Sequence, residues 1–355
     1  MTKYKFDEIA INSTQKKKPT EDDKVYYIGL EHIDPGCFDV VRWGSDVAPT
    51  GDKLLMQKGD VLFGKRRAYQ RKVAIAPFDG IFSAHGMVLR PNLKVIDANY
   101  FPFFISSDKF METAVRISVG GLSPTINWKD LARQEFELPS LDEQKVLSDK
   151  LWAAYRLKEA YKKLLVATDE MVKSQFIEMF GGESNKVPFE EIVVVKDDCR
   201  RPINEGVRSE MKDGELYPYY GATGVVDYIN DYLTDDELLC IAEDCGNYNA
   251  GEESAYIIRG KAWVNNHAHL VKTKEACDVK YLYYFLKIAD LKPYVSGTTR
   301  LKLTQKKLKK ISVTLPSTDK QKTFVKIAEQ ADKSKFELRK SIDAIDKVIK
   351  SLINN

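Results

Sequence analysis

The chain has 355 residues, of which 43% are hydrophobic and 30% are charged, and its formal net charge is +3. This hydrophobic content supports more than one packed core, and the near-neutral charge means that any nucleic-acid surface has to be local. No apolar run reaches membrane-spanning length, the N-terminus is no signal peptide, and the five cysteines are scattered. We therefore expect a cytoplasmic protein with reduced cysteines and without structural zinc.

The first 140 residues are predicted to form an α+β domain made of short strands. Strand-like runs lie at 25–33, 61–63, 73–76 and 81–89, and 100–117 is predicted to be helical. A polar, glycine-containing loop follows at 120–127. Ser123 and Asn127 are candidate phosphate contacts from this loop, which precedes the long helix.

A basic loop follows the strand at 61–63. Five positive charges fall within the eight residues from Lys65 to Lys72. Cations can contact phosphate, arginine can read guanine and glutamine can read adenine. The loop's candidate DNA contacts are Lys65, Arg66, Arg67, Tyr69, Gln70 and Arg71. A solvated surface loop explains the same residues equally well.

Residues 141–182 are predicted to form one long helix, with about forty residues free of Gly and Pro that would extend roughly 60 Å at ~1.5 Å per residue. Ser140 and Glu143 form a capping box, and Gly181-Gly182 supplies the end. Residues spaced alternately by four and three draw one stripe along it: Leu147, Leu151, Ala154, Lys158, Tyr161, Leu165, Thr168, Val172, Gln175 and Met179.

Residues 183–316 repeat the order of the first domain, with strands expected at 238–242, 256–258 and 262–264 and a helix at 281–288. The run 217–224 is predicted to be an aromatic and glycine turn. Arg300, Lys302, Lys306, Lys307, Lys309 and Lys310 form a second basic cluster. The candidate DNA contacts here are Tyr219, Tyr220, Asn247, Asn249, Asn266, His267, Arg300, Lys302 and Thr304.

The C-terminal residues 317–355 repeat the long helix 177 positions later. Leu138-Pro139-Ser140 recurs as Leu315-Pro316-Ser317, Gln144 as Gln321, and even the polar stripe residue Lys158 as Lys335. The chain is therefore read as two copies of one unit, each a globular domain followed by a long helix. Two unrelated amphipathic helices are the weaker reading.

Two long stripes in one chain most simply pack on each other as a coiled coil. Antiparallel pairing is expected, because parallel pairing would require the second domain to span the whole rod. The fold class predicted is α+β, with two pseudo-repeated domains joined by two long antiparallel helices. The predicted packing residues are Leu147, Leu151, Tyr161, Leu165, Val172, Leu338, Ile342, Ile345, Ile349 and Leu352.

Catalytic motifs are weak. Gly246 and Gly251 have the spacing of a P-loop, but Glu252 stands where lysine is needed. Glu143-Gln144-Lys145 matches the E-x-K of some nucleases but lies in the capping turn of the helix. A metal-dependent nuclease around Glu243 and Asp244 stays open as an alternative, as does a coiled-coil scaffold without sequence-specific DNA binding. No catalytic or metal-binding residue is assigned.

The sequence resembles the specificity subunit of type I restriction-modification systems over essentially its whole length. The features that carry the resemblance are Leu138-Pro139-Ser140-Leu141-x-Glu143-Gln144 with its repeat at Leu315, Lys58-Gly59-Asp60-Val61-Leu62, and the runs at 217–224 and 265–269. The chain starts directly in the first domain, so an N-terminal helical arm of the family is expected to be missing.

The resemblance implies two target-recognition domains, at 1–140 and 183–316, that read the halves of a bipartite double-stranded DNA site. The helices at 141–182 and 317–355 would set a fixed gap between these halves. It also implies docking of two methyltransferase subunits and of restriction (motor-nuclease) subunits, and no active site in this chain. S-adenosylmethionine, ATP and Mg²⁺ would belong to the partners, so no cofactor is expected here.

Overall fold

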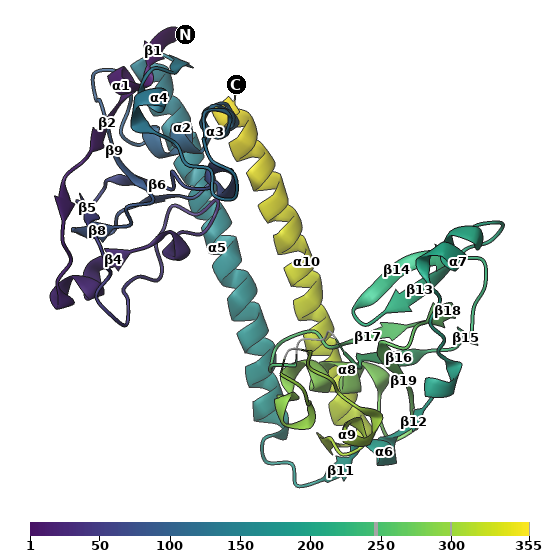
Figure 1. Ribbon diagram of the computed structural model, residues 1–355. Coiled ribbons are helices and arrows are strands. Elements are labelled where there is room, and N and C mark those ends of the chain that lie inside the picture. The colour runs from purple at the N-terminus through teal and green to yellow at the C-terminus, as the bar shows by residue number, and fades with distance from the viewer. Residues whose placement is uncertain (245–247, 299, 355) are drawn as a thin grey trace. The chain divides into compact units, whose positions relative to one another are not determined.

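The computed structural model describes residues 1–244, 248–298 and 300–354. It divides the chain into two compact units: unit 1 consists of Met1–Tyr161 and Lys340–Asn355, and unit 2 of Lys162–Arg339. Each unit contains a globular part and one half of each of two long helices, which Figure 1 draws in teal and yellow. Among the described residues, no helix has the length and apolar character that crossing a membrane requires.

Unit 1 contains two four-stranded sheets, in the orders β2-β9-β6-β7 and β3-β5-β8-β4, and a separate β1-β10 ladder. The strands are β1 (Thr2–Lys5), β2 (Ala10–Ser13), β3 (Lys16–Lys17), β4 (Tyr27–Ile28), β5 (Lys53–Met56), β6 (Val61–Phe63), β7 (Val73–Ile75), β8 (Gly80–Phe82), β9 (Met87–Pro91) and β10 (Glu135–Leu138). The helices of its globular part are α1 (Phe6–Ile9), α2 (Phe101–Ser106), α3 (Asp108–Arg116) and α4 (Trp128–Ala132).

Aromatic side chains fill the core of unit 1. The Phe6 ring lies 5.3 Å from that of Phe110 and 5.9 Å from that of Phe136, and all three residues are buried. This core attaches α1 and α3 to the end of β10, from which the first long helix continues.

Unit 2 repeats this arrangement with sheets β12-β19-β16-β17 and β14-β13-β18-β15 and a β11-β20 ladder. Its strands are β11 (Lys186–Pro188), β12 (Val193–Val195), β13 (Tyr217–Gly221), β14 (Gly224–Ile229), β15 (Thr234–Asp235), β16 (Leu238–Ala242), β17 (Ala255–Ile258), β18 (Lys261–Val264), β19 (Ala268–Thr273) and β20 (Ser312–Thr314). Its short helices are α6 (Phe189–Ile192), α7 (Glu205–Glu210), α8 (Val279–Ile288) and α9 (Gln305–Leu308).

Four local predictions were wrong or incomplete. The expected strand 81–89 is divided between β8 and β9, and the expected helix 100–117 is divided between α2 and α3. The run 25–33 forms only the two-residue strand β4, with 3₁₀ turns at Glu21–Tyr26 and Leu30–His32 on either side. His32 accepts the backbone N–H of Gly29, a local bond that competes with sheet pairing. The expected turn at 217–224 is instead a hairpin, because β13 pairs with β14 and Gly224 takes φ +133° at the turn.

The two long helices are α5 (Leu141–Phe180) and α10 (Thr318–Asn354). The capping box at the start of α5 is formed, since Glu143 Oε2 accepts hydrogen bonds from the backbone N–H and the hydroxyl of Ser140. Every residue of the predicted α5 stripe is buried or half-buried, and so are the predicted α10 positions Leu338, Ile342, Ile345, Ile349 and Leu352. The prediction of an α+β fold with two long packed helices is confirmed.

Among the described residues, a lysine–aspartate ion pair connects the two helices within each unit. In unit 1, Lys158 Nζ of α5 lies 2.6 Å from Asp346 Oδ1 of α10. In unit 2, Lys335 Nζ of α10 lies 2.7 Å from Asp169 Oδ1 of α5. The two lysines are 177 positions apart in the sequence, and so are the two aspartates. In unit 1 the lysine comes from α5 and the aspartate from α10, and in unit 2 the reverse holds.

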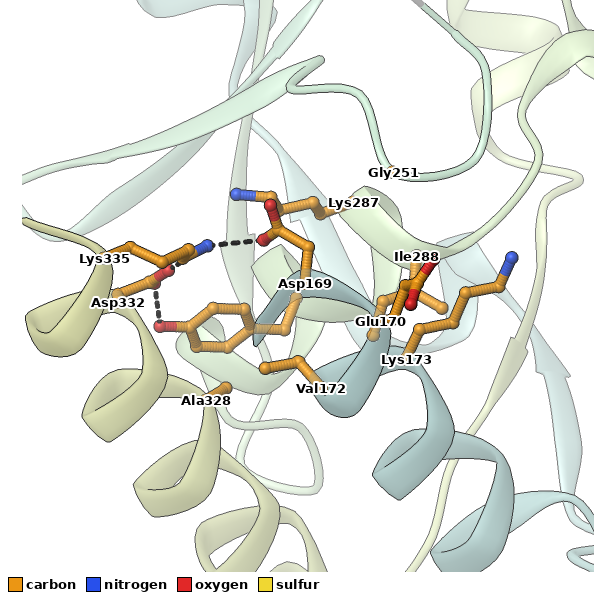
Figure 2. Close-up of a pocket in the computed structure, with 11 residues that line it drawn as sticks. Asp169, Glu170, Val172, Lys173, Gly251, Lys287, Ile288, Ala328, Asp332 and Lys335 are labelled. Atoms are coloured by element: carbon orange, nitrogen blue, oxygen red, sulfur yellow. Dashed lines mark hydrogen bonds and ion pairs between the residues drawn. The ribbon is translucent and has the colours of Figure 1, made fainter. Parts of the chain in front are cut away.

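Each ion pair lies at a pocket between the helices and the globular part of its own unit. In unit 2 the pocket measures about 150 Å³, and Figure 2 shows Lys335 between Asp332 and Asp169, with Val172 and Ala328 completing an apolar side. The unit 1 pocket measures about 560 Å³ and contains the repeat-equivalent helix residues Tyr155, Lys158, Asp346, Ile349 and Lys350.

A buried glutamine anchors each helix start to its globular part. Gln144 accepts the N–H of Asp97 at 2.8 Å and donates to the carbonyls of Val95 and Pro139. Gln321 makes the same three bonds, to the N–H of Asp278 and the carbonyls of Ala276 and Pro316. Both glutamines are fully buried, so their amides are the polar partners of these backbone groups.

Candidate nucleic-acid interface

The basic loop of unit 1 lies between two buried strands. It begins after β6, and the Gly64 N–H donates to the Lys72 carbonyl at 2.9 Å, which closes the loop just before β7. Ala68 is buried and anchors it. Arg67 and Arg71 both take left-handed backbone angles, φ 56° and 52°, on either side of a 3₁₀ turn at Ala68–Gln70. The alanine therefore points inward while the flanking cations stay at the surface.

The structure brings the basic loop together with the loop before α4. The Arg67 N–H donates to the Pro124 carbonyl at 2.7 Å, and the Ile126 N–H donates to the Lys65 carbonyl at 3.0 Å. The Arg67 guanidinium donates to Ser123 Oγ at 3.0 Å and 3.2 Å. Two segments predicted separately, Lys65–Arg67 and Ser123, thus form one surface.

Three basic residues that the sequence analysis did not select, Lys16, Lys53 and His85, lie at this surface or just beneath it, where Lys53 is buried and donates to the carbonyls of Thr50 and Gly51. Arg66 Nη1 lies 3.4 Å from His85 Nε2. Burial, followed by the positive charges of Arg66, Lys65 and Lys53, lowers the pKa of His85. Burial and the nearby Lys16 likewise lower the pKa of Lys65. We call the set Lys16, Lys53, Lys65, Arg66, Arg67 and His85 the basic face.

Besides burial, the closeness of the positive charges of the basic face lowers the pKa of Lys65 and of His85. An anion such as a phosphate would offset this repulsion, so the basic face can attract one. The register explains its assembly: β3 pairs Lys17 with Lys53, and β5 pairs Leu54 with Phe82, one residue before the loop that carries His85. Of Lys16, Lys53 and His85, only Lys16 lies in a basic run of the sequence, Lys16-Lys17-Lys18. Lys53 and His85 have no basic neighbours in the chain, so the sequence did not indicate them.

The other candidates of the basic loop differ in exposure and engagement. Tyr69 is 55% exposed and Gln70 is half-buried. Arg71 donates to the Ser106 carbonyl at 2.9 Å and lies 2.7 Å from Asp108 Oδ1, so it connects the loop to α3. Asn127, at the start of α4, is exposed and donates to Asp130 Oδ2 at 3.3 Å.

Acidic residues in unit 2 occupy the position of the basic loop. Isolated β-bridges join Arg66 to Thr125 in unit 1 and Asp244 to Lys302 in unit 2. A second bridge joins Thr125 to Val119 in unit 1 and Lys302 to Ser296 in unit 2, so the same bridge pattern occurs in both units. Asp244 therefore corresponds to Arg66. Its Oδ2 lies 2.8 Å from Arg300 Nη2 and its Oδ1 lies 2.9 Å from His267 Nδ1.

Glu243 neutralises two more cations of unit 2. Its carboxylate lies 2.6 Å from Arg200 Nη1 and 2.9 Å from Lys302 Nζ. Burial raises the pKa of Glu243, but the hydrogen bonds from Lys302 and Arg200 outweigh it and hold that pKa below its usual value. Arg300 and Lys302, which the sequence analysis placed in an open basic cluster, are thus paired with acids.

A buried histidine lies beneath this network. His269 Nε2 donates to the Leu303 carbonyl at 2.8 Å, and His269 Nδ1 lies 2.8 Å from Asp197 Oδ2. Asp197 also accepts from the Leu270 N–H and from Gln305 Nε2. The network connects the ends of β16 and β19 to the loop before α9, and Thr304 lies at the start of α9. We call Asp197, Arg200, Glu243, Asp244, His267, His269, Arg300 and Lys302 the charge network.

The remaining candidates of unit 2 are dispersed. Tyr219 is 2% exposed, and its hydroxyl accepts the Ile203 N–H at 3.1 Å, so it is a core residue and is not available to DNA. Tyr220 is half-buried and stacks on Tyr256 with ring centroids 5.5 Å apart. Asn249 and Asn266 are exposed, and Asn249 donates to Glu252. Asn247 lies outside the described residues.

The carboxylates of unit 2 do not form a recognisable metal centre in the described part of the chain, where no group of three or more His, Cys, Asp or Glu side chains has metal-binding geometry. Glu243 and Asp244 bind cationic side chains instead. The geometry of these two residues is that of an ion-pair network.

A model of the type I restriction modification DNA specificity domain matches residues 3–165 and, a second time, residues 183–346. The chain belongs to this family. The two matches coincide with the two repeats, each containing a globular part and most of a long helix.

Curated proteins that are similar to this chain are named as type I restriction enzyme specificity subunits. A Haemophilus influenzae protein named as a type I restriction enzyme specificity subunit (S.HindORF215P) is 34% identical over 42% of this chain and 37% of its own length. The EcoDI specificity subunit of Escherichia coli is 23% identical over 50% of this chain and 41% of its own length. The matched parts therefore span less than half of each relative.

Two solved structures share the fold. The S subunit of a type I restriction-modification system from M. genitalium superposes with a TM-score of 0.60 at 15% identity, covering 99% of this chain and 94% of that one. A chain from a structure of complex assembly and conformational transition in the type I R-M system gives 0.59 at 14% identity, covering 99% and 96%.

Proposed function

We propose that this chain is the non-catalytic DNA specificity subunit of a type I restriction-modification complex. The observation that carries the proposal is that one DNA specificity-domain model matches both repeats. Each unit would read one half of a bipartite double-stranded DNA site with a fixed gap. In unit 1 the basic face, with Tyr69, Gln70 and Ser123 beside it, would contact the phosphates and bases of one half.

Unit 2 would use a different surface chemistry. Its charge network neutralises Arg300 and Lys302, so its reading of bases would depend more on hydrogen-bonding groups such as Asn249, Asn266 and His267 than on free cations. We expect unit 1 to contribute more of the salt-dependent affinity and unit 2 proportionally more of the sequence discrimination.

The partners would be two methyltransferase (modification) subunits and, where the system restricts DNA, motor-nuclease subunits. S-adenosylmethionine, ATP and Mg²⁺ would be bound by those partners, and the assembly would act in the cytoplasm. The metal-dependent nuclease alternative would place Glu243 and Asp244 on a metal, in competition with Arg200, Lys302, Arg300 and His267.

The test is DNA binding by this chain co-expressed with the modification subunit of its own genome, on a randomised duplex library at two salt concentrations. We expect a bipartite sequence preference that survives the higher salt. Binding that fades with salt without any sequence preference would contradict the proposal and favour a scaffold. Mg²⁺-dependent cleavage by the purified chain alone would favour the nuclease.

A further inference from the structure

Leu122 carries an almost fully exposed side chain at the tip of a closed loop in unit 1. It is 96% exposed, more than any other large hydrophobic side chain among the described residues. Two hydrogen bonds close the loop below it, from the Val119 N–H to the Thr125 carbonyl at 3.0 Å and from the Thr125 N–H to the Val119 carbonyl at 2.9 Å. An apolar side chain that stays in water adds little to the stability of its own unit, so packing does not explain this leucine.

Backbone hydrogen bonds fix this loop against the basic loop. The Arg67 N–H donates to the Pro124 carbonyl, and the Ile126 N–H donates to the Lys65 carbonyl. Gly120, at the start of the loop, takes φ +114°, a left-handed angle that favours glycine. A single exposed leucine is ordinary on a protein surface. This one differs because the loop that carries it is held in place beside the basic face.

Ser123, the next residue after Leu122, orients the Arg67 guanidinium. Its Oγ accepts hydrogen bonds from Arg67 Nε and Nη2, which lie on one edge of the guanidinium. Within the described part of the chain, this leaves Nη1 and the second N–H of Nη2, which together form the end of the fork. That end matches the O6 and N7 acceptors of a guanine in the major groove. The serine therefore presents Arg67 to a guanine.

An apolar side chain beside this arginine can read one feature of the major groove. Leucine has no hydrogen-bonding group in its side chain, and the apolar group that base edges present there is the C5-methyl of thymine. Consecutive Cα atoms lie about 3.8 Å apart and base pairs stack about 3.4 Å apart. A guanine bound by Arg67 therefore places Leu122 over a neighbouring base pair. A leucine wedge between base pairs acts from the minor groove instead.

We propose that Leu122 contacts the C5-methyl group of a thymine in the base pair next to the guanine that Arg67 reads. This inference rests on the proposed function, which supplies the double-stranded DNA. Leu122 touches the base itself, whereas Ser123 is a positioning residue that acts through Arg67. The unit 1 half-site then contains a thymine, in one strand or the other, directly beside that guanine–cytosine pair.

The test replaces thymine by uracil, which removes only the C5-methyl group. The full chain, co-purified with the modification subunit, binds a set of duplexes in which each thymine of the preferred site is replaced in turn. We expect one replacement, beside the guanine that Arg67→Ala no longer discriminates, to weaken binding about fourfold, the effect of losing one buried methyl group. Leu122→Ala should weaken binding to the thymine duplex at least as much, and should not distinguish thymine from uracil at that position.

Leu93→Ala is the matched control. Leu93 is also an exposed leucine of unit 1, at 66%, but it follows Pro91 at the end of β9. The basic loop lies near the other end of that strand, where Phe63 pairs with Met87. Leu93→Ala should therefore keep the thymine preference. Both leucines are exposed, so neither replacement should unfold unit 1, and hydrogen exchange of unit 1 checks this.

Each other outcome has a separate meaning. If Leu122→Ala binds like the unmodified chain, or still distinguishes thymine from uracil, Leu122 does not read the methyl group although the proposed function stands. A rise in the fluorescence of 2-aminopurine placed in the neighbouring base pair, lost in Leu122→Ala, would assign the leucine as a wedge and overturn the proposal. If the unmodified complex has no bipartite sequence preference, the proposed function fails and this inference fails with it.

Discussion

At the scale of single residues, the structure separates the surface cations by what they contact. Among the described residues, the Arg67 side chain donates only to Ser123 Oγ, whereas Arg71 is held by Asp108 and the Ser106 carbonyl. Both arginines take the same left-handed backbone angles. Their different partners make Arg67 the stronger candidate for base reading and give Arg71 a structural role.

Arg67→Ala should weaken binding to the preferred DNA by ~1–3 kcal/mol and relax one position of the site, if Arg67 reads a base. The matched control is Lys16→Ala, also on the basic face, which should weaken all sequences equally and reduce the salt slope by about 1. Binding isotherms at several salt concentrations measure both. Equal losses for Arg67→Ala on every sequence would refute a base-reading role.

The ion pairs between the helices are unequal in burial. The Lys158 side chain is 11% exposed and that of Asp346 is 48% exposed. Asp346→Ala should therefore destabilise unit 1 by about 3 kcal/mol, because it leaves a buried ammonium without its partner. Lys158→Met should cost clearly less, since the remaining carboxylate is half solvated. Hydrogen exchange in residues 340–354 measures the difference, and an equal loss of protection in both variants would contradict this assignment.

At the scale of elements, the same ion pairs explain why α5 and α10 pack antiparallel in each unit. In a parallel pairing in the register of the repeat, Lys158 would face Lys335 and Asp169 would face Asp346. In the antiparallel arrangement each lysine faces an aspartate instead. Polar residues at single core positions are known to select orientation and register in this way. The stripe alone would not distinguish the two orientations.

The charge network of unit 2 should make its loops acid-sensitive. Burial raises the pKa of Asp197, but hydrogen bonds from His269, Leu270 and Gln305 outweigh it, and the pKa lies below its usual value. Burial is likewise outweighed at Asp244, by His267 and Arg300. Carboxylates with depressed pKa values contribute stability that is present above their unfolded pKa of about 4 and is lost as the pH falls through the lower folded value.

We therefore expect unit 2 to lose hydrogen-exchange protection near 243–244 and 300–305 below about pH 4. Asp197→Asn should produce part of this loss at neutral pH. The corresponding loop of unit 1 serves as the internal control, because Arg66 replaces Asp244 there. Protection in unit 2 that does not change between pH 6 and pH 3 would contradict a supporting role for these ion pairs.

At the scale of the whole molecule, the repeat predicts that equivalent substitutions in the two units have equivalent effects on stability. Gln144→Leu removes the partner of three buried backbone groups in unit 1, and Gln321→Leu does the same in unit 2. Each orphaned group costs about 1–3 kcal/mol. Each variant should therefore weaken its own unit, as measured by hydrogen exchange. Gln175→Leu removes an exposed bond to Glu178 and puts an apolar side chain into the packing stripe of α5, so it should weaken neither unit. A glutamine variant that leaves its own unit unchanged would contradict this role.

The sequence by itself determined the two repeats, the long helices and the packing stripes. These are periodic features, and a heptad of apolar residues or a repeated Gln and Lys is visible without coordinates. It also determined the basic loop, because those cations are consecutive.

Only the tertiary structure decided the composition of the two candidate surfaces. Lys53 and His85 join the basic face through strand register, and Glu243 neutralises Lys302 from a strand end 59 residues earlier in the chain. Tyr219 is buried because it lies in the hairpin of β13 and β14, although the prolines and glycines around it favour a surface turn. Long-range pairing between strands sets which charges meet, and local residue patterns contain no record of that pairing.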